Sequence, residues 1–470
     1  MGGKAALLLV LGFSLIFLVM GQNFNGLSTR SVDNYIDYYT NTTSHNIAIS
    51  GANMAANKVF INKDWDTGFS DVTFAGGKLN VYVSNPLAGS GKVTICHVPP
   101  GNPAAKHEIV IPASAVPAHL KQGDYMGPCS GRPVDYEKVT IISEGTFQGR
   151  TDVVEVELRP SSYSKFGYFS DIWGGGYLVT GDTVSGPFHT NGTLRTLGSP
   201  VFMGKATAKG LKAVGNKWGF GKADPKFNGG LDTPVNIPFK LDISKMETAA
   251  NYDGRVFADN AHNKAQDLRL KFNDDKTVEW SVKRSNESTW STPVTALLDT
   301  LAPNGVIWNK AGNLYVSGEV NGKYTIGTAK SGKKYGNVYI EDDVKYREPP
   351  ILFLPNGKTA INPAVHDMLG IVAAKQVVIK DNAANHNDVE IDASLFNYDG
   401  GITVENISPS SPDMGALKIY GGLIEKEAQT TGYTNGAGYN ELIRYDARYM
   451  TQVPPFFPAT GKYEIVSWYE

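Results

Sequence analysis

An apolar run near the N-terminus, AALLLVLGFSLIFLVM from Ala5 to Met20, constrains the fold of this chain more than any other feature. Three uses of such a run are open. A secretory signal peptide has a basic start and an apolar core of about 7–15 residues; Lys4 fits that pattern, although Val19-Met20-Gly21 is a poor cleavage site. A membrane span needs about 20 apolar residues, and this run is shorter. The third use is a helix that first lies in a membrane and later packs against copies of itself.

The sequence that follows the run continues a helical pattern and therefore favours the third use. Apolar or aromatic residues first recur at close to helical spacing, at Phe24, Leu27, Val32, Tyr35, Ile36 and Tyr39. The next stretch, ISGANMAANKVF, is rich in small residues, and no proline occurs before Pro86. We predict one long assembly helix over residues 1–60 whose second half covers a domain core. Gly21 and Gly26 are its weak points, because glycine is a poor helix former.

Side chains within the apolar run are the candidates for contacts between copies of the chain. Ser14 carries the only polar side chain in the run, and packing at Gly12 and Ser14 offers one way to fix the register of neighbouring helices. The predicted assembly residues are Leu8, Leu11, Gly12, Ser14, Leu15 and Leu18.

Charge and composition exclude some classes of function. The chain has 470 residues, enough for two or three domains, and a formal net charge of −2. We therefore expect no broad basic surface and no nucleic-acid partner. With 51 glycines, 25 prolines and only 19% charged residues, the composition is that of a strand-rich, turn-rich protein. Two cysteines close in sequence indicate one disulfide and an oxidising, exported setting.

The pattern changes from helical to alternating after residue 71, which predicts strands. FAGGKLNVYVSN, KVTIISEGTF (138–147) and TDVVEVELRP (151–160) alternate apolar and polar residues. The last two are joined by a turn at Gln148-Gly149-Arg150. We predict a small antiparallel meander, packed on the helix, within a unit that spans residues 61–160.

The first 160 residues resemble a type IV pilin-like protein of the PilX type. The resemblance lies in the hydrophobic helix, its small-residue second half and the meander VTIISEGTFQGRTDVVEVEL. It implies a bacterial protein that lies in the inner membrane before assembly and then forms a homo-oligomeric, helical filament at the cell surface or outside the cell. Most major pilins carry Glu at the fifth mature position, whereas this chain has Ala5 if Met1 is the mature start, so subunit registration is unexplained.

An inserted module, residues 91–131, interrupts the meander where a hairpin turn would suffice. It resembles a short motif of many secreted bacterial proteins, C-H-x-P-P-G-N-P…H-x-I…A-H-L-x-x-G-D…C, which usually has a further His where this chain has Gln122. Three imidazoles and a carboxylate suit Zn²⁺ or a similar divalent metal. The predicted ligands of a structural metal are His97, His107, His119 and, less firmly, Asp124. In the alternative, the histidines make ordinary polar contacts.

The two cysteines of the insert, Cys96 and Cys129, allow two interpretations. They could be metal ligands, but an exported setting favours a disulfide. Its loop of about 33 residues would contribute on the order of 3–4 kcal/mol in the chain-entropy model. A module of about 40 residues needs such a cross-link, because it buries little apolar surface alone.

Residues 161–470 consist of short apolar segments punctuated by glycine. Segments such as LGIVAAKQVVIKD and GALKIYGGLIEKEA predict strands that stack as rungs of a parallel β-helix-like surface domain, with a hairpin inserted at roughly 265–300. A β-sandwich is the alternative. The order of segments resembles the DUF4900-type domain of bacterial surface proteins, in GGGYLVTGDTVSGPFHTNG, IEDDVKY and the closing YDARYMTQVPPFFP. We expect the closing segment to cap the β-helix or to dock on a neighbour. The predicted fold is thus mainly β with a long N-terminal helix.

Candidate sites in this second half are few. One loop gathers oxygen ligands that suit Ca²⁺, at Asp381, Asn382, Asn385, Asn387 and Asp388, but its spacing is not that of an EF-hand and these residue types are also common in turns. Glu341-Asp342-Asp343 has the composition of a catalytic carboxylate cluster, yet acidic runs at strand ends are usually solvated. The chain contains no G-x-S-x-G, H-E-x-x-H, phosphate-loop or haem motif, so we expect no enzymatic activity.

These expectations define one leading function and two alternatives. The leading function is a structural subunit of an extracellular type IV pilus-like filament that assembles through its N-terminal helix. The first alternative is a minor pilin or a membrane-anchored adhesin with a surface or polysaccharide ligand. The second is a surface metalloenzyme or a β-helix protein that acts on polysaccharide.

Overall fold

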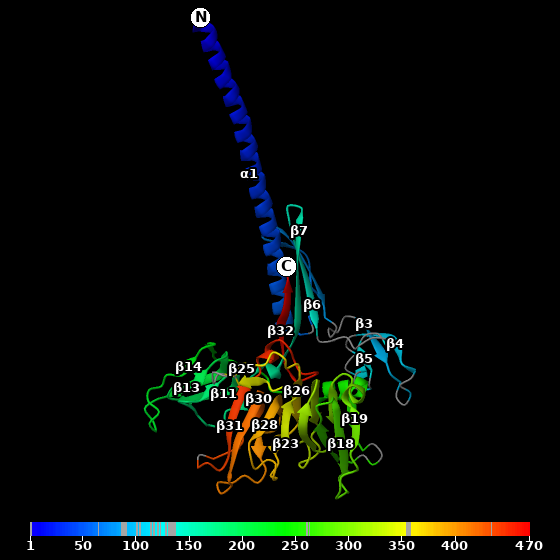
Figure 1. Ribbon diagram of the computed structural model, residues 1–470. Helices are drawn as coiled ribbons and strands as arrows, with labels where there is room; N and C mark the ends of the chain where they lie inside the picture. Colours follow the sequence, from blue (N-terminus) through cyan, green and yellow to red (C-terminus); the bar gives the residue numbers. More distant parts are fainter. Residues whose placement is uncertain are drawn as a thin grey trace.

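The computed structural model describes most of the chain. The described residues are 2–63, 65–85, 92–99, 102, 105–112, 115, 118–119, 122, 124–126, 129, 138–259, 262, 264–353, 359–433 and 435–470. Met1, and with it the question of the mature start, lies outside them, as do parts of the insert. Within them, one long helix is followed by a large, mainly β structure, which confirms the predicted fold class (Figure 1).

Helix α1 (Gly2–Ile61) is continuous through both predicted weak points, Gly21 and Gly26. At about 1.5 Å per residue it is about 90 Å long. Every described side chain up to residue 39 is exposed, and the first buried one is Thr40. The N-terminal half therefore projects from the β structure without an intramolecular core, as Figure 1 shows.

The second half of α1 packs on a five-stranded antiparallel sheet with strand order β1-β2-β6-β7-β32. Its strands are β1 (Phe69–Phe74), β2 (Gly77–Ser84), β6 (Val139–Phe147), β7 (Arg150–Ser162) and β32 (Ala459–Tyr469). The predicted turn between β6 and β7 has Gln148 and Gly149 at φ of 47° and 82°, as a tight hairpin turn requires. Strands β2, β6 and β7 are the three strands of the predicted meander, and β1 is a further strand that was not predicted.

Strand β32 is the unexpected member of this first sheet. From the sequence we expected it to belong to the unit 161–470, as a cap or a docking segment. In the structure it pairs antiparallel with β7, from Ala459 opposite Ser162 to Tyr469 opposite Glu155. The physical reason is that β7 would otherwise present an unpaired edge.

Small residues allow α1 to lie close to the first sheet. The buried face of the helix is made of Ile47, Ala48, Ala52, Ala55, Ala56 and Val59. It packs against sheet residues such as Leu79, Ile141 and Val156. The closest approach is at Gly145, where an added β-carbon would lie 2.2 Å from the carbonyl oxygen of Ser44 and 2.5 Å from the amide nitrogen of Ala48.

The insert forms a small antiparallel sheet of its own with strand order β4-β3-β5. Its strands are β3 (Lys92–His97), β4 (His107–Pro112) and β5 (Tyr125–Met126). The register pairs His97 with His107 across β3 and β4, and Cys96 with Tyr125 across β3 and β5. The chain thus brings parts of the motif that are distant in sequence together.

The remaining strands form the solenoid, which we define as residues 168–445. In chain order they are β8 (Tyr168–Ile172), β9 (Leu178–Val179), β10 (Thr183–Val184), β11 (Phe188–Leu197), β12 (Val201–Phe202), β13 (Ala206–Val214), β14 (Lys226–Phe227), β15 (Leu231–Asp232), β16 (Arg255–Phe257), β17 (Gln266–Phe272), β18 (Thr277–Arg284), β19 (Val294–Leu297), β20 (Val306–Asn309), β21 (Leu314–Val320), β22 (Lys323–Thr328), β23 (Val338–Tyr346), β24 (Ile351–Phe353), β25 (Thr359–Ile361), β26 (Met368–Ala373), β27 (Val377–Ile379), β28 (Val389–Asn397), β29 (Thr403–Val404), β30 (Asp413–Glu427) and β31 (Gly438–Tyr445). Helices α3 (Ile243–Asp253) and α4 (Leu298–Leu301) lie among them, and the short helices η3 (Tyr163–Lys165) and η4 (Ala447–Met450) flank them.

Parallel pairing identifies the solenoid as a stack of rungs rather than a sandwich. Strands β20, β22, β26, β28 and β30 pair in parallel, each with the next. A second parallel ladder joins β17, β21, β23, β27 and β29. Sandwiches are built from antiparallel sheets, so the alternative prediction is wrong. The predicted hairpin insert is present as the antiparallel run β17-β18-β19.

The order of the rungs does not follow the order of the chain. Strand β30 pairs with β31 along its first part and with β8 along its last part. Strand β8 in turn pairs in parallel with β11, and β11 with β13. Strands β8, β11 and β13, among the first in the chain, therefore extend the stack beyond β30, one of the last. From there the chain returns to begin the opposite end of the stack.

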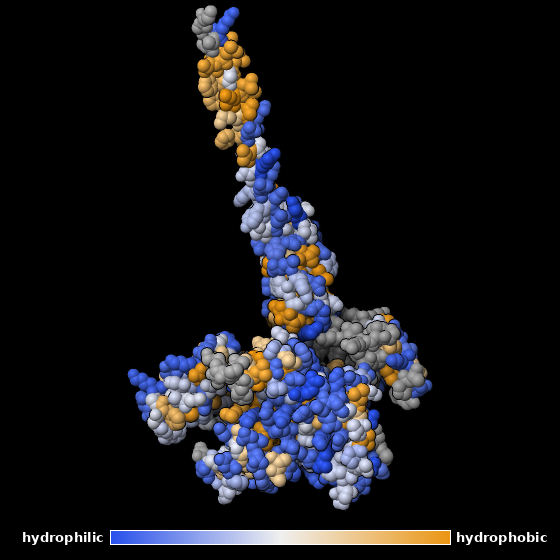
Figure 2. Space-filling view, in the orientation of Figure 1, coloured by the Kyte–Doolittle hydropathy of each residue, from blue (hydrophilic) through white to orange (hydrophobic). Residues whose placement is uncertain are grey.

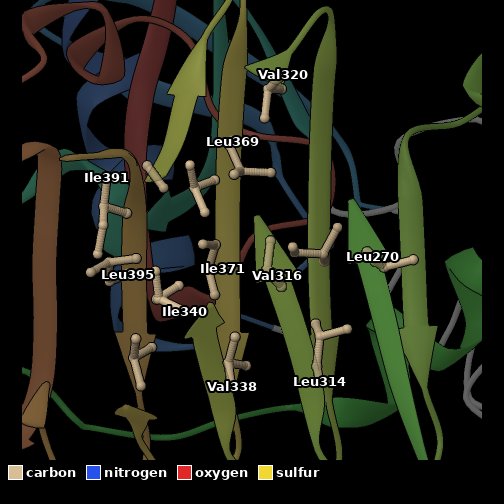
Figure 3. Close-up of a cluster of buried hydrophobic side chains, with 14 of the residues drawn as sticks. Leu270, Leu314, Val316, Val320, Val338, Ile340, Leu369, Ile371, Ile391 and Leu395 are labelled. Carbon is tan, nitrogen blue, oxygen red and sulfur yellow. The ribbon is translucent and has the colours of Figure 1, made fainter. Parts of the chain in front are cut away.

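Inward-facing aliphatic side chains fill the solenoid. Figure 3 shows them stacked from rung to rung, for example Leu314 beside Val338 and Ile371 beside Leu395, pairs that are also in register. All four are fully buried. Burial of each such side chain contributes roughly 1.5–3 kcal/mol, so the repeated register holds the rungs together.

The carboxyl groups of Asp392 and Glu425 lie inside the solenoid and are almost completely buried, at 0% and 1% exposed. Burial raises the pKa of Asp392 from 3.8 to about 8 and the pKa of Glu425 from 4.5 to about 8. Asp392 accepts a hydrogen bond from the backbone N–H of Tyr346 at 2.9 Å, and Glu425 accepts one from the hydroxyl of Tyr168 at 2.6 Å. Both groups therefore keep their protons in the folded state at neutral pH.

The solenoid is expected to lose stability as the pH rises from about 4 to about 8. The unfolded chain releases both protons near pH 4, whereas the folded chain retains them, so each pH unit in this window favours unfolding. The amide double variant Asp392→Asn/Glu425→Gln removes both titrations. Urea unfolding at several pH values should show a loss on the order of a few kcal/mol for the natural chain and a flatter profile for the variant. An equally steep profile in the variant contradicts the assignment.

Candidate functional site

The exposed half of α1 is the largest feature that the fold leaves without a partner. Of the described helices, α1 alone is long and apolar enough to cross a membrane, and no part of its most apolar stretch is buried. The predicted leucines Leu8, Leu11, Leu15 and Leu18 are 72%, 55%, 60% and 62% exposed. Gly12 and Ser14 are exposed as well. Figure 2 shows the apolar surface gathered at the free end of the helix.

Apolar side chains surround this helix instead of forming one stripe. Beside the predicted residues, Leu9, Phe13 and Phe17 are 60%, 55% and 70% exposed. A helix that is apolar all round belongs in a membrane or in the core of an assembly. The exposed apolar surface therefore covers the whole circumference of the helix and includes more than the predicted residues. Ala5 lies in this helix, with its side chain outside the described atoms.

Asp124 forms the centre of a polar cluster in the insert. Its buried carboxylate accepts hydrogen bonds from His97 Nδ1 at 2.9 Å, from His119 Nδ1 at 2.6 Å and from the backbone N–H of Val98 at 2.7 Å. Burial alone would raise the pKa of Asp124, but these hydrogen bonds outweigh it and hold the pKa below its usual range. The carboxylate is thus ionised and fully engaged.

This arrangement decides which histidine atoms remain available. An ionised carboxylate only accepts hydrogen bonds, so Nδ1 of His97 and His119 carries the proton. In neutral rings Nε2 then presents its lone pair, as metal-bound histidines do when a carboxylate orients them. One nitrogen of His97, one nitrogen of His119 and one carboxylate oxygen of Asp124 lie within 4.8 Å of one another, so the two rings are gathered around the carboxylate that orients them.

His107 lies beside this group without belonging to it. Its ring is 5.3 Å from the ring of His97, centre to centre, and its Nδ1 lies 3.1 Å from the carbonyl oxygen of Ala105. Gln122, which replaces a further histidine of the motif, is exposed. Three of the four predicted ligands are brought together, and the fourth is adjacent.

The two cysteines are joined, which confirms the predicted disulfide. Cys96 and Cys129 are bonded, with their α-carbons 4.9 Å apart. The interpretation that both thiolates bind metal does not apply to the disulfide-bonded protein. The bond ties the end of the insert to the strand that carries His97.

Removing the disulfide is expected to loosen the insert alone. In the double variant Cys96→Ser/Cys129→Ser, the loss of loop closure costs about 3–4 kcal/mol by the chain-entropy model. Hydrogen exchange should accelerate in β3 and β4 and stay unchanged in the first sheet. Reduction of the natural protein should reproduce this pattern, and unchanged protection in β3 would show that the bond is not what orders the insert.

The side chains of the predicted calcium loop bind hydrogen-bond donors of the protein and the ammonium group of a lysine. The Asp381 carboxylate accepts from His386 Nε2 at 2.8 Å and from Asn406 Nδ2 at 3.0 Å. The Asp388 carboxylate pairs with Lys418 at 2.7 Å. Asn385 is buried and donates to two backbone carbonyls, whereas Asn387 is exposed. The calcium site stays a prediction, and the structure gives these side chains turn-forming contacts.

The acidic run 341–343 is not gathered into one site. Glu341 pairs with Arg269 at 2.8 Å, and Asp343 pairs with Lys345 at 3.2 Å. The carboxylate of Asp342 accepts a bond from the next backbone N–H. The run lies in the middle of β23 and not at a strand end, so that part of the expectation is wrong, and its carboxylates are engaged by these separate contacts.

A group of ion pairs, which the sequence alone did not predict, joins the base of the projecting helix to the first sheet. His45 of α1 lies 2.8 Å from the carboxylate of Asp152 and 3.5 Å from that of Glu470, the last residue. About two turns nearer the N-terminus of α1, Asp37 pairs with Arg150 at 3.1 Å. These partners are far apart in sequence, and no local pattern marks them.

Comparison with known proteins gives little beyond the fold class. Neither the family models nor the curated proteins compared with this chain gave a match. Among solved structures, the crystal structure of the competence-associated pilin ComZ from Thermus thermophilus is similar with a TM-score of 0.31 and 13% identity, over 74% of this chain and 86% of that chain. Similarity of this degree carries no argument about function, and the following proposals rest on the residues of this chain.

Proposed function

We propose that the chain is a structural subunit of a bacterial extracellular, type IV pilus-like filament. The observation that supports this best is the division of α1 into two halves. The half after residue 40 is packed on the first sheet, and the half before it projects, with apolar side chains on every side of residues 7–20. Burial of apolar surface at roughly 25 cal/mol per Å² favours a shared core of such helices.

The docked half of the helix argues for assembly rather than for a removable signal. A signal peptide is cut from the mature protein, but here the apolar run continues without a break into the helix that carries Ile47 and Val59 of the domain core. A membrane anchor uses the same run, and we propose that it serves this role in the inner membrane before assembly. Copies that add head to tail form an open, helical assembly.

Cell fractionation after shearing tests this function and separates it from the adhesin alternative. A major subunit should dominate the sheared extracellular fraction. The pelleted material should appear as filaments in electron micrographs. A minor or tip subunit would be a small part of that fraction. A chain that stays with the membrane and never appears in the sheared material contradicts the filament proposal.

We also propose that the insert holds one structural divalent metal, with Zn²⁺ as the fitting ion. The hydrogen-bonded placement of His97 and His119 around Asp124 supports it, because carboxylate-oriented imidazoles are good zinc ligands. The metal would stabilise a module with few buried side chains.

Elemental analysis and thermal unfolding test the metal. We expect about one zinc per chain, and a chelator should lower the unfolding temperature of the insert. The variant His97→Ala/His119→Ala should lose the metal but keep assembly. His262→Ala is the control, because His262 also pairs with an aspartate, Asp259 at 2.9 Å, but lies outside the insert. Full metal content in the double variant contradicts the site.

A further inference from the structure

One segment of the solenoid is strongly basic although the chain as a whole is not. Residues 195–226 contain seven cations and a single acid, Asp224, in a chain whose formal net charge is −2. We call the surface formed by this segment the lysine wing. Its cations are Arg195, Lys205, Lys209, Lys212, Lys217, Lys222 and Lys226.

The fold places these cations together at one end of the solenoid. The segment covers the end of β11, all of β13 and the loop that follows, which Figure 1 shows at the left edge of the molecule. Arg195 of β11 lies in register beside Lys212 of β13. All six lysines are exposed, and Figure 2 shows hydrophilic residues at the tip of this edge.

Most of the wing's charge is not neutralised by neighbouring acids. Lys205 pairs with Asp232 at 3.0 Å and Lys226 with Asp224 at 2.5 Å. For the other five cations, no acidic partner lies within ion-pair distance among the described residues. Such a cluster produces a positive potential that attracts anionic partners.

An exposed tryptophan, Trp218, and a half-buried tyrosine, Tyr177, lie among these cations. Trp218 is 68% exposed, with Lys217 Nζ 4.2 Å above its ring and the ring of Tyr177 6.2 Å away. Two hydrogen bonds fix the loop, from Thr180 Oγ1 to the Phe220 carbonyl at 3.3 Å and from the Asp224 N–H to the Gly198 carbonyl at 2.9 Å. The loop is anchored, so the indole is held in place at the surface.

We propose that the lysine wing binds an acidic polysaccharide. Ammonium groups act as point charges, which suits repeated carboxylates or sulfates, whereas tight phosphate recognition favours the arginine fork that this surface offers only once. The flat face of Trp218 provides a platform for the apolar face of a sugar ring. This inference does not depend on filament assembly, since the wing lies on the solenoid and not on α1.

Binding of the full-length chain in non-ionic detergent to immobilised alginate tests the proposal. The natural chain should bind, and its affinity should fall steeply as salt increases. The variant Lys209→Gln/Lys212→Gln/Lys217→Gln/Lys222→Gln should bind at least about tenfold more weakly and with a shallower salt dependence. Trp218→Ala should weaken binding to alginate more than binding to poly-glutamate, which carries carboxylates but no sugar rings.

A matched control separates the wing from net charge. Lys271, Lys310, Lys333 and Lys334 are exposed lysines elsewhere on the solenoid, and replacing all four by glutamine makes the same change in charge. This control should bind alginate as the natural chain does. The proposal is overturned if the control loses as much affinity as the wing variant, if Trp218→Ala affects both polymers equally, or if duplex DNA binds more tightly than alginate at the same salt concentration.

Discussion

A Leu15→Asp chain should fold its β structure normally and fail to form filaments. Leu15 lies in the middle of the apolar run and is 60% exposed in the single chain, so the substitution breaks no intramolecular contact. In a bundle of copies the new carboxylate would be buried without a partner in every subunit. Each such charge costs several kcal/mol. The helix centre of a membrane penalises it by about 2.5–3.5 kcal/mol as well.

The control for this experiment carries the same charge in the same helix. Asn25→Asp places a carboxylate at an exposed position beyond the apolar run, where the helix is more polar. Electron microscopy and the sheared fraction should show filaments for Asn25→Asp and none for Leu15→Asp. Normal filaments from Leu15→Asp would mean that this part of α1 is not in an apolar core.

Gly145→Ala should separate α1 from the first sheet. Its β-carbon would lie 2.2 Å from the backbone oxygen of Ser44 and 2.5 Å from the backbone nitrogen of Ala48, so no side-chain rotation relieves the contact. Helix and sheet must move apart, which opens the interface around Ile47. Overpacking of this kind costs about 1–3 kcal/mol, and backbone contacts favour the upper end.

Limited proteolysis and urea unfolding measure this effect. Cleavage between residues 40 and 61, which the sheet protects in the natural chain, should become faster in Gly145→Ala. Gly210→Ala is the control, because Gly210 also lies in a strand but an added β-carbon there meets its nearest neighbour at 3.6 Å, an ordinary contact. Equal stability of the two variants would show that the interface is looser than described.

Local patterns were enough to predict the helix, the meander and the rung-like strands. The helical spacing after Phe24 and the absence of proline foretold an unbroken α1. Alternation foretold β6 and β7, and their connecting turn has the backbone angles that Gln148 and Gly149 suggested. Each of these signals lies within a few residues, where propensity and periodicity act.

Long-range pairings were beyond the reach of such patterns. Nothing in the closing segment indicates that β32 pairs with β7, some 300 residues earlier, and its alternation would suit any open edge. Likewise, β8 pairs with the last part of β30, where β31 leaves the edge of that strand open, although the two strands are far apart in the sequence. Parallel strands without a fixed repeat length leave their neighbours undetermined in the sequence.

The candidate sites show the same division. The cysteine pair and the exported setting predicted the disulfide, and the motif predicted that His97 and His119 lie close together. Neither predicted that Asp124 accepts both Nδ1 hydrogens. The net charge suggested no basic surface, because an average over the whole chain conceals the run from Arg195 to Lys226. A charge count in windows of about 30 residues would have revealed the lysine wing.

The structure of the assembled material tests the central claim most directly. A helical reconstruction by electron cryomicroscopy should show a core made of α1 helices, with residues 7–20 of each copy buried against neighbouring helices and the first sheet and solenoid outside. It should also show whether packing at Gly12 and Ser14 fixes the register of neighbouring helices, since residue 5 is alanine and not glutamate. A filament whose core lacks residues 7–20, or material that stays dispersed once the membrane is removed, would contradict the account.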